Sequence, residues 1–220
     1  MFENGQRTGK GFQEWTDGTQ YEGSFVNGEK SGEGMIAYPN GDIYRGNFEK
    51  DMIKGSGQLS HYDNTFIIGT FRGNPCITQG DVDQYYTDGY WYHGPMKNLI
   101  RHGQGILSIQ NNIVYKGEYK DGKRDGKGDL TFQDGSSYSG LWKEDKMHGT
   151  GTYTWKNKSS YSGHWKNGVP DGIGEWKYYD GSSYTGRFKE GKRQGRGVYA
   201  FCNGYVLDGL WYNDEFVSEC

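Results

Sequence analysis

The sequence predicts an all-β protein, an elongated single-layer antiparallel ribbon of nine tandem 23-residue β-hairpin repeats. Three observations predict it. Glycine and aromatic residues dominate the composition, a Tyr-x-Gly motif recurs with a fixed period, and a turn-forming pair stands three residues before each motif. A fixed period of this length is typical of repeat architectures, in which each unit contacts only its neighbours.

The composition argues against an ordinary globular core. Only 32% of the 220 residues are hydrophobic, yet 16% are aromatic, and glycine contributes 38 residues. Aliphatic side chains are therefore scarce, whereas a thin sheet that buries one aromatic face does not need them. Disordered chains are also poor in aliphatics, but they lack aromatics as well. The composition therefore favours a folded sheet.

The repeat defines the register of the whole chain. The first position of the Tyr-x-Gly motif recurs at steps of 23 residues, except for one step of 25 between Ile67 and Tyr92. Ile67 and Leu207 replace tyrosine at two of the nine positions. The nine motif positions are Tyr21, Tyr44, Ile67, Tyr92, Tyr115, Tyr138, Tyr161, Tyr184 and Leu207.

The turn-forming pairs predict where each hairpin reverses. Asx followed by Gly or Asn favours type I′ turns, because both central residues of that turn need a positive φ. Lys158 fits this turn poorly, so we expect strain or another turn there. The pairs are Asp17-Gly18, Asn40-Gly41, Asp63-Asn64, Asp88-Gly89, Asn111-Asn112, Asp134-Gly135, Asn157-Lys158, Asp180-Gly181 and Asn203-Gly204.

Alternation along the strands predicts which face is buried. Residues two apart share a face, so each motif tyrosine, the glycine after it and the aromatic residue four positions on lie together. The glycine has no side chain and leaves a slot for the flanking rings. The opposite face carries residues such as Glu22, Arg45, Lys116 and His164, and we expect it to be solvated.

A second glycine pair, Gly-x-Gly, recurs eight times, and we expect it in the loop that leads from one hairpin to the next. Residues 67–105 are irregular: Ile67 replaces tyrosine, Thr78 occupies the place of the first glycine, and two residues are inserted near Asn74-Pro75-Cys76-Ile77. The irregularity is neutral drift, a bend in the ribbon, or a dedicated partner contact. The expected organisation is a lead-in at 1–8, a repeat array at 9–213 and a polar tail at 214–220.

The motifs resemble those of the MORN (membrane occupation and recognition nexus) repeat family. The stretch from Tyr138-Ser-Gly-Leu-Trp142 through Gly149-Thr-Gly151 to Tyr161 matches the family pattern closely, and the resemblance extends from Gly9 to about Trp211. It implies a rod of hairpins with an aromatic groove that binds extended peptides, dimerises, or organises cytoskeletal and membrane-associated assemblies. Family members occur in cilia and flagella, including radial spokes, and others are fused to lipid kinases.

No chemistry-bearing motif stands apart from the repeat. Glycine-rich stretches lack the spacing and the following helix of a phosphate-binding loop. The three cysteines, Cys76, Cys202 and Cys220, are too few and too distant for a disulfide framework or a zinc site. We therefore expect a non-enzyme without cofactor or metal. A net charge of −3 with no strongly basic half argues against nucleic acid as a partner.

The predicted function is a scaffold that binds extended or helical segments of partner proteins, in a cytoplasmic cytoskeletal assembly and most of all an axoneme. A homodimer is an open alternative. We place the partner groove over residues 138–188, where large rings are densest. The candidate groove residues are Tyr138, Trp142, Trp155, Tyr161, Trp165, Tyr178, Tyr184 and Phe188.

Two rival functions stay open. One is a phospholipid-binding or membrane-tethering module, in which a basic stripe along one edge contacts anionic lipid. The other is a regulatory array that acts on a separate enzyme. Acidic neighbours largely cancel the stripe, so solvated loops explain its residues as well. The stripe consists of Lys123, Arg124, Lys146, Lys192, Arg193 and Arg196.

Overall fold

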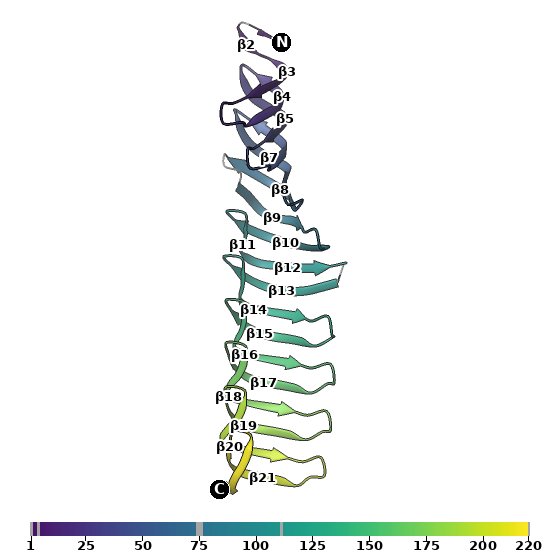
Figure 1. The fold of residues 1–220 in the computed structure, drawn as a ribbon, viewed down its shortest axis with the longest axis vertical. Coiled ribbons are helices and arrows are strands. Elements are labelled where there is room, and N and C mark those ends of the chain that lie inside the picture. The colour runs from purple at the N-terminus through teal and green to yellow at the C-terminus, as the bar shows by residue number, and fades with distance from the viewer. Residues whose placement is uncertain (1, 4, 74–76, 111, 220) are drawn as a thin grey trace. The chain divides into compact units, whose positions relative to one another are not determined.

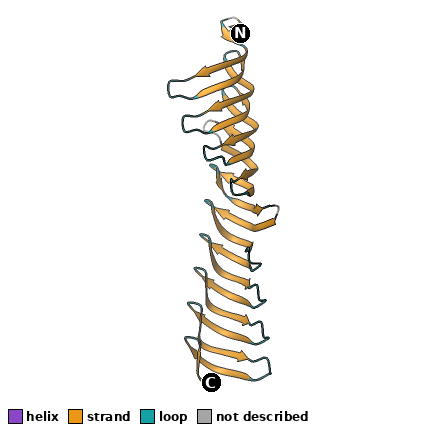
Figure 2. Cartoon of the chain, turned by 45° about the vertical axis from the view of Figure 1, so that its right-hand side comes forward, coloured by secondary structure: helices purple, strands orange, loops and turns teal. Residues whose placement is uncertain are grey.

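The computed structural model describes residues 2–3, 5–73, 77–110 and 112–219, and within these residues every regular element is a β-strand (Figures 1 and 2). Asn111, the segment 74–76 with Cys76, and Cys220 lie outside the described residues. The chain divides into two compact units, residues 1–112 and 113–220. Within each unit, every strand pairing is antiparallel and most of them join strands that follow one another along the chain, which confirms the predicted all-β class.

The first unit contains the strands that precede Ile113. A short hairpin pairs β1 with β2, and the remaining strands form a separate sheet. The strands are β1 (Phe2–Glu3), β2 (Gln6–Arg7), β3 (Gly9–Glu14), β4 (Gln20–Val26), β5 (Glu29–Ala37), β6 (Ile43–Glu49), β7 (Met52–Ser60), β8 (Phe66–Gly73), β9 (Ile77–Tyr85), β10 (Tyr90–Lys97), β11 (Ile100–Arg101) and β12 (Gly103–Ile109).

The second unit is more regular. Its strands alternate between seven and nine residues from β14 to β21. The strands are β13 (Asn112–Lys120), β14 (Lys123–Thr131), β15 (Ser137–Lys143), β16 (Lys146–Thr154), β17 (Ser160–Lys166), β18 (Val169–Lys177), β19 (Ser183–Lys189), β20 (Lys192–Ala200), β21 (Val206–Tyr212) and β22 (Glu215–Glu219). The segments that the sequence set apart as lead-in and tail therefore also form strands.

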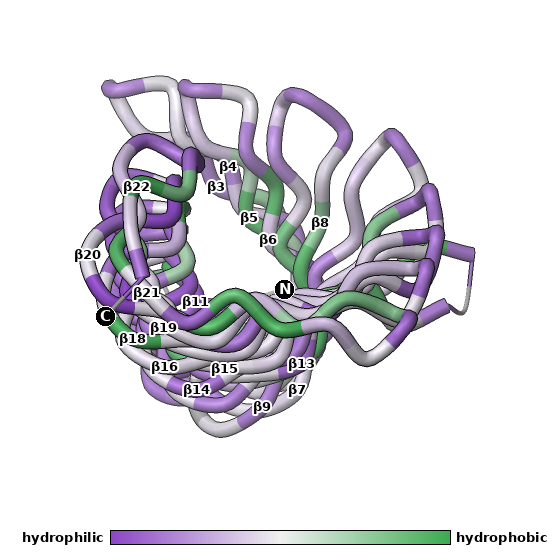
Figure 3. Tube along the Cα trace, turned by 90° about the horizontal axis from the view of Figure 1, so that it is seen from below, coloured by the Kyte–Doolittle hydropathy of each residue, from purple (hydrophilic) through white to green (hydrophobic). Residues whose placement is uncertain are grey.

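The buried face is the predicted one. The motif tyrosines from Tyr21 to Tyr184 and Ile67 are at most 1% exposed, and the aromatic residues four positions on are at most 5% exposed. The rings contact edge to face along the chain: the Tyr138 ring centroid lies 5.0 Å from that of Trp142 and 5.4 Å from that of Trp165. Each tyrosine thus bridges its own repeat and the next one. Figure 3 shows hydrophilic residues gathered at the projecting turns.

In the repeats that carry a motif tyrosine, that ring fills the slot beside the motif glycine. A Cβ added at Gly140 would lie 2.6 Å from the Tyr138 Oη, and one added at Gly151 would lie 2.3 Å from it. These two glycines are cross-strand partners. The Tyr138 hydroxyl then donates to the Leu141 carbonyl at 2.9 Å. The ring therefore lies flat over two neighbouring strands, which no residue with a side chain would permit at either position.

The Asx-Gly turns differ from the prediction. In eight of the nine predicted pairs only the second residue has a positive φ, as at Gly18 (87°), so these are not type I′ turns. The Gly18 N–H donates to the Trp15 carbonyl and the Trp15 N–H to the Thr19 carbonyl. This is a type I turn followed by a left-handed residue, and the Asp17 side chain supports it by accepting from the Thr19 N–H. Lys158 keeps this turn, at a left-handed φ of 71°.

The turns with two positive φ values lie at the other end of each hairpin. Asn27 and Gly28 have φ values of 51° and 84°, and Glu144 and Asp145 have 47° and 66°. Sequence reasoning missed them because many, such as Glu144-Asp145, lack the Asx-Gly signature. These turns also join the repeats: the Asp145 N–H donates to the Arg124 carbonyl at 3.0 Å. Gly168 and Gly191 donate in the same way to Met147 and Pro170.

The Gly-x-Gly pairs lie inside strands, and the prediction that they form loops is wrong. Gly149 and Gly151 both belong to β16. The first glycine has a left-handed φ, 63° at Gly149, and opposite it the register shifts between Gly140 and Trp142. Glycine permits this bulge without steric strain. The second glycine is the one that lies under the tyrosine ring.

The irregular repeat keeps its packing by a paired change. The left-handed glycine is retained at Gly80 (φ 71°), so Thr78 is not its replacement. Val82 stands instead where the second glycine would be, and it is 2% exposed. A Cβ added at Gly69 would lie 2.5 Å from the Val82 Cγ1. The smaller Ile67 and the larger Val82 together fill the space of one tyrosine and one glycine. A bend at this repeat stays a prediction.

A double-mutant cycle tests this compensation. Ile67→Tyr alone forces a ring against Val82, and Val82→Gly alone leaves a cavity beside Ile67, so each should lower the free energy of unfolding by about 1–3 kcal/mol. The double variant restores the regular pair. We expect a favourable coupling of about 1 kcal/mol or more in chemical denaturation. Additive losses would contradict the compensation.

Candidate functional site

A row of partly exposed rings runs along the buried face of the second unit. We call it the aromatic ladder. Its consecutive ring centroids are 4.6–5.9 Å apart, and Trp155 stacks on Trp176 at 4.6 Å with an interplanar angle of 19°. In contrast to the motif tyrosines, none of its members is buried, and Phe201 is 39% exposed. The ladder consists of Phe132, Tyr153, Trp155, Trp176, Tyr178, Tyr199 and Phe201.

The strand pattern explains the position of the ladder. Tyr153 is the cross-strand partner of both Tyr138 and Tyr161, so it lies on their face of the sheet. Trp155 follows two residues later and shares that face at the start of the turn. The next two repeats place Trp176 with Tyr178, and Tyr199 with Phe201, in the same way. Corresponding pairs in the first unit, such as Ile36 with Tyr38, are not doubly aromatic.

Two ladder tyrosines are fixed by buried serines. The Tyr153 hydroxyl lies 2.9 Å from the Ser136 Oγ, which donates to the Asp134 carboxylate at 2.6 Å. The Tyr199 hydroxyl meets Ser182 with the same geometry. Hydrogen bonds from the Ser136 hydroxyl and N–H lower the pKa of the Asp134 carboxyl, so it stays an ionised acceptor. The rings are therefore oriented before any partner arrives.

The indole N–H groups divide into two sets. Trp142, Trp165 and Trp211 each donate to the carbonyl of a Gly-x-Gly glycine, at 2.9–3.0 Å. Trp155 and Trp176 have no hydrogen-bond acceptor for their Nε1 among the residues that the structure describes. The first set of donors holds the core together. The second set is available to a ligand.

The structure separates the predicted groove residues into two groups. Trp155 and Tyr178 belong to the ladder. The other six are at most 5% exposed and form its floor, so a ligand does not reach them directly: Tyr138, Trp142, Tyr161, Trp165, Tyr184 and Phe188. Sequence reasoning missed Phe132, Tyr153, Trp176, Tyr199 and Phe201 as site residues. A pair of aromatic residues two apart before the turn was the signal for most of them.

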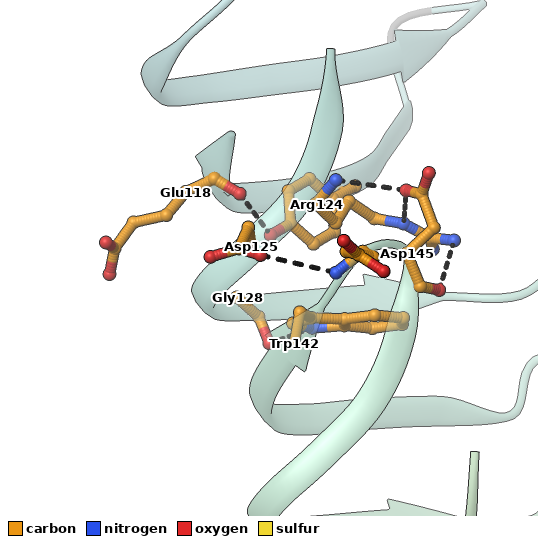
Figure 4. Close-up of polar contacts among 8 residues, drawn as sticks. Glu118, Arg124, Asp125, Gly128, Trp142 and Asp145 are labelled. Atoms are coloured by element: carbon orange, nitrogen blue, oxygen red, sulfur yellow. Dashed lines mark hydrogen bonds and ion pairs between the residues drawn. The ribbon is translucent and has the colours of Figure 1, made fainter. Parts of the chain in front are cut away.

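The predicted basic stripe is partly built into the fold. The Arg124 guanidinium lies 4.2 Å from the Trp142 ring centroid, and its Nε donates to the Asp145 carboxylate at 3.0 Å (Figure 4). Arg193 lies over Trp211 at 4.4 Å and pairs with Asp214 in the same manner. These two arginines clamp neighbouring repeats. Exposed positive charge is left at Lys123, Lys146, Lys192 and Arg196.

The described residues offer neither a metal site nor a membrane-spanning helix. No group of three or more histidine, cysteine, aspartate or glutamate side chains there is placed to hold a metal ion. That part of the chain also has no helix with the length and apolar character needed to cross a membrane.

The family model for the MORN repeat matches seven segments that together span well over half of the chain. They are residues 1–20, 21–43, 44–66, 115–137, 138–160, 161–183 and 184–204. The chain belongs to the MORN repeat family. The predicted count of nine is thus approximate, since residues 67–114, which include the irregular segment, are unmatched.

No curated protein matches the chain. Solved structures that resemble it include the TCP domain of Drosophila melanogaster SAS-4 (dCPAP), in complex with a proline-rich motif of Ana2 (dSTIL). It is 16% identical, with 92% of this chain and 90% of that chain covered and a TM-score of 0.32. The G-box domain of the microcephaly protein CPAP is 14% identical, with 93% and 100% covered and a TM-score of 0.37. Likeness at this level supports no statement about binding by this chain.

Arg193 and Arg196 form a matched pair for testing the clamp. Arg193→Ala removes a ring contact and an ion pair that join two repeats, so the free energy of unfolding should fall by about 1–3 kcal/mol. Arg196 is mostly exposed, and its Nε lies 4.0 Å from the Asp208 Oδ1, which makes a weak surface ion pair. Arg196→Ala should therefore change stability by less than about 0.5 kcal/mol in thermal and chemical denaturation. Equal losses for the two variants would contradict the assigned clamp.

The buried tyrosines predict a loss of stability at high pH. Burial raises the pKa of Tyr138, Tyr161 and Tyr184 to about 12, against 10.0 for a free tyrosine. In that interval the unfolded chain has lost protons that the folded chain keeps, so stability falls as pH rises. Tyrosinate absorbance and circular dichroism followed together should show late ionisation of these rings coupled to unfolding. Ionisation of all the tyrosines with a midpoint near pH 10.0, in a sheet that remains native, would contradict this.

Proposed function

We propose that this chain is a non-catalytic scaffold that holds a segment of a partner protein against the aromatic ladder. The ladder carries the proposal: seven adjoining rings remain partly exposed on a face where the motif tyrosines and the aromatic residues four positions after them are buried. Interfaces concentrate their binding energy in Trp and Tyr, because these rings bury large areas with few rotamers to restrict. The tethered hydroxyls of Tyr153 and Tyr199 fix two rings in advance, which lowers the entropy that binding must offset.

The setting we propose is a cytoskeletal assembly in the cytoplasm, most of all an axoneme. Membership of the MORN family supports an organising role, and the repeated surface suits a protein that positions partners along its length. Imaging of the tagged protein in its native cell, with a microtubule marker, tests the setting. A uniform cytosolic signal would contradict it without bearing on the ladder.

Contact with anionic membranes is a second candidate, and the structure gives it less support. Arg124 and Arg193 are committed to rings and carboxylates, which leaves four exposed cations among acidic neighbours. Vesicles containing phosphatidylserine separate the candidates, because binding through Lys123, Lys146, Lys192 and Arg196 would weaken as salt rises. A regulatory array acting on a separate enzyme would use the same ladder.

Selection of a random peptide library on the full chain tests the scaffold directly. Trp155→Ala should lower the affinity for the selected peptides by about thirtyfold, because an interface anchor contributes about 2 kcal/mol. Trp165→Ala, in the floor, should instead lower stability by about 3–5 kcal/mol. Tyr62→Ala is the control, since that ring is 78% exposed and lies off the ladder.

Two outcomes would contradict the scaffold. One is a library from which no peptide is enriched. The other is enriched peptides that bind the folded Trp155→Ala chain as well as they bind the parent chain.

A further inference from the structure

We propose that the aromatic ladder binds a polyproline II segment in which an apolar residue, proline above all, recurs at every third position. This inference rests on the proposed function and specifies its partner. Three properties of the ladder lead to it: its repeat length, its unsatisfied indole donors, and its location on a sheet face away from the strand edges.

The repeat length of the ladder fits one backbone conformation. The ladder crosses the strands, and each repeat contributes two of them, so equivalent rings recur at roughly 9.6 Å. A polyproline II helix advances about 9.3 Å in its three-residue turn. Every third residue of such a segment therefore meets an equivalent pair of rings, from Trp155 to Tyr178 to Phe201.

In other conformations the spacing of side chains on one face matches the spacing of the rings less closely. In an α-helix, equivalent positions on one face recur every seven residues, or roughly 10.5 Å, so they move ahead of the rings by about 1 Å in each repeat. In an extended strand, side chains on one face recur at about 6.7 Å, which also does not match. The ladder also lies on the face of the sheet, and strand addition requires an edge.

The indole donors suit the same partner. A polyproline II backbone has no internal hydrogen bonds, so its carbonyl groups are free to accept. Trp155 and Trp176 present Nε1 donors that no described residue accepts, whereas Trp142, Trp165 and Trp211 donate theirs to backbone carbonyls. Proline residues lack an N–H, so a partner rich in them offers acceptors and apolar rings. Aromatic-lined grooves with such donors recognise polyproline II ligands.

The charges near the ladder select no strongly charged partner. Lys156 and Lys158 lie in the turn after Trp155, while Asp134 and Asp180 lie in the neighbouring turns. Both carboxylates already accept hydrogen bonds from serine side chains. With both signs present, recognition depends on the rings and the two indole donors. A largely uncharged proline-containing segment satisfies this surface.

Fluorescence anisotropy with labelled synthetic peptides and the full chain tests the inference. The first probe is a peptide of about ten residues with proline at every third position and Ala or Gln elsewhere, long enough for three repeats at about 3.1 Å per residue. The second has the same composition with prolines at irregular spacing. The third is an Ala-rich helical peptide with Leu replacing proline.

We expect the first peptide to bind at least about tenfold more tightly than the second and third, because only its apolar residues stay in step with the rings. Trp155→Phe and Trp176→Phe keep a ring and remove the N–H donor, so each should lower the affinity for the first peptide about fivefold. Tyr62→Ala should leave binding unchanged. Folding of every variant is checked by circular dichroism.

The outcomes separate this inference from the proposed function. Equal binding of the first two peptides, or tighter binding of the helical one, overturns the polyproline II assignment while leaving a ladder that binds peptides. If the parent chain and both Trp→Phe variants bind the first peptide with equal affinity, the indole N–H groups do not contribute to binding. That result also overturns the polyproline II assignment. If neither the three peptides nor any library peptide binds, the scaffold proposal fails as well.

Discussion

The packing of a tyrosine ring over two glycines is the constraint on which the rest of the structure depends. Tyr138 lies over Gly140 and Gly151, and the neighbouring repeats place Tyr161 and Tyr184 in the same way. Because the ring crosses two strands and then contacts the aromatic residue of the following repeat, one side chain fixes pairing within a repeat and stacking between repeats. A sheet with few aliphatic residues can bury its core in this manner without a second layer.

The same constraint explains why the ladder stays accessible. The floor rings are placed next to glycines, which let them sink against the backbone. Ladder rings such as Trp155 and Tyr178 stand where the strand passes into its turn, with no glycine opposite to receive them. They stack on one another instead, as Trp155 does on Trp176, and both rings stay partly exposed. A core and a binding surface can therefore share one face of the sheet.

The fold was largely predictable from the sequence, because period-two alternation and the 23-residue spacing both report which residues face the core. The turns were less so: a positive φ at Asp145 depends on the geometry of a two-residue hairpin and has no residue signature there. The exchange between Ile67 and Val82 was also hidden, because only the register shows that these side chains share a space. Of the ladder, the sequence predicted Trp155 and Tyr178 only. The density of rings in the sequence does not distinguish Trp165, which is buried, from Trp155, which is partly exposed.

The hydrogen bonds that join repeats, from Asp145 to Arg124, from Gly168 to Met147 and from Gly191 to Pro170, have a consequence for how such a chain changes over evolutionary time. These particular hydrogen bonds join backbone groups, so they can form whatever side chains the two repeats carry. After duplication or loss of one whole 23-residue unit, the flanking strands can pair again. The sheet is then longer or shorter by roughly 9.6 Å. An insertion of any other length must be absorbed in a turn. The length of such a sheet therefore changes during evolution in steps of one whole repeat.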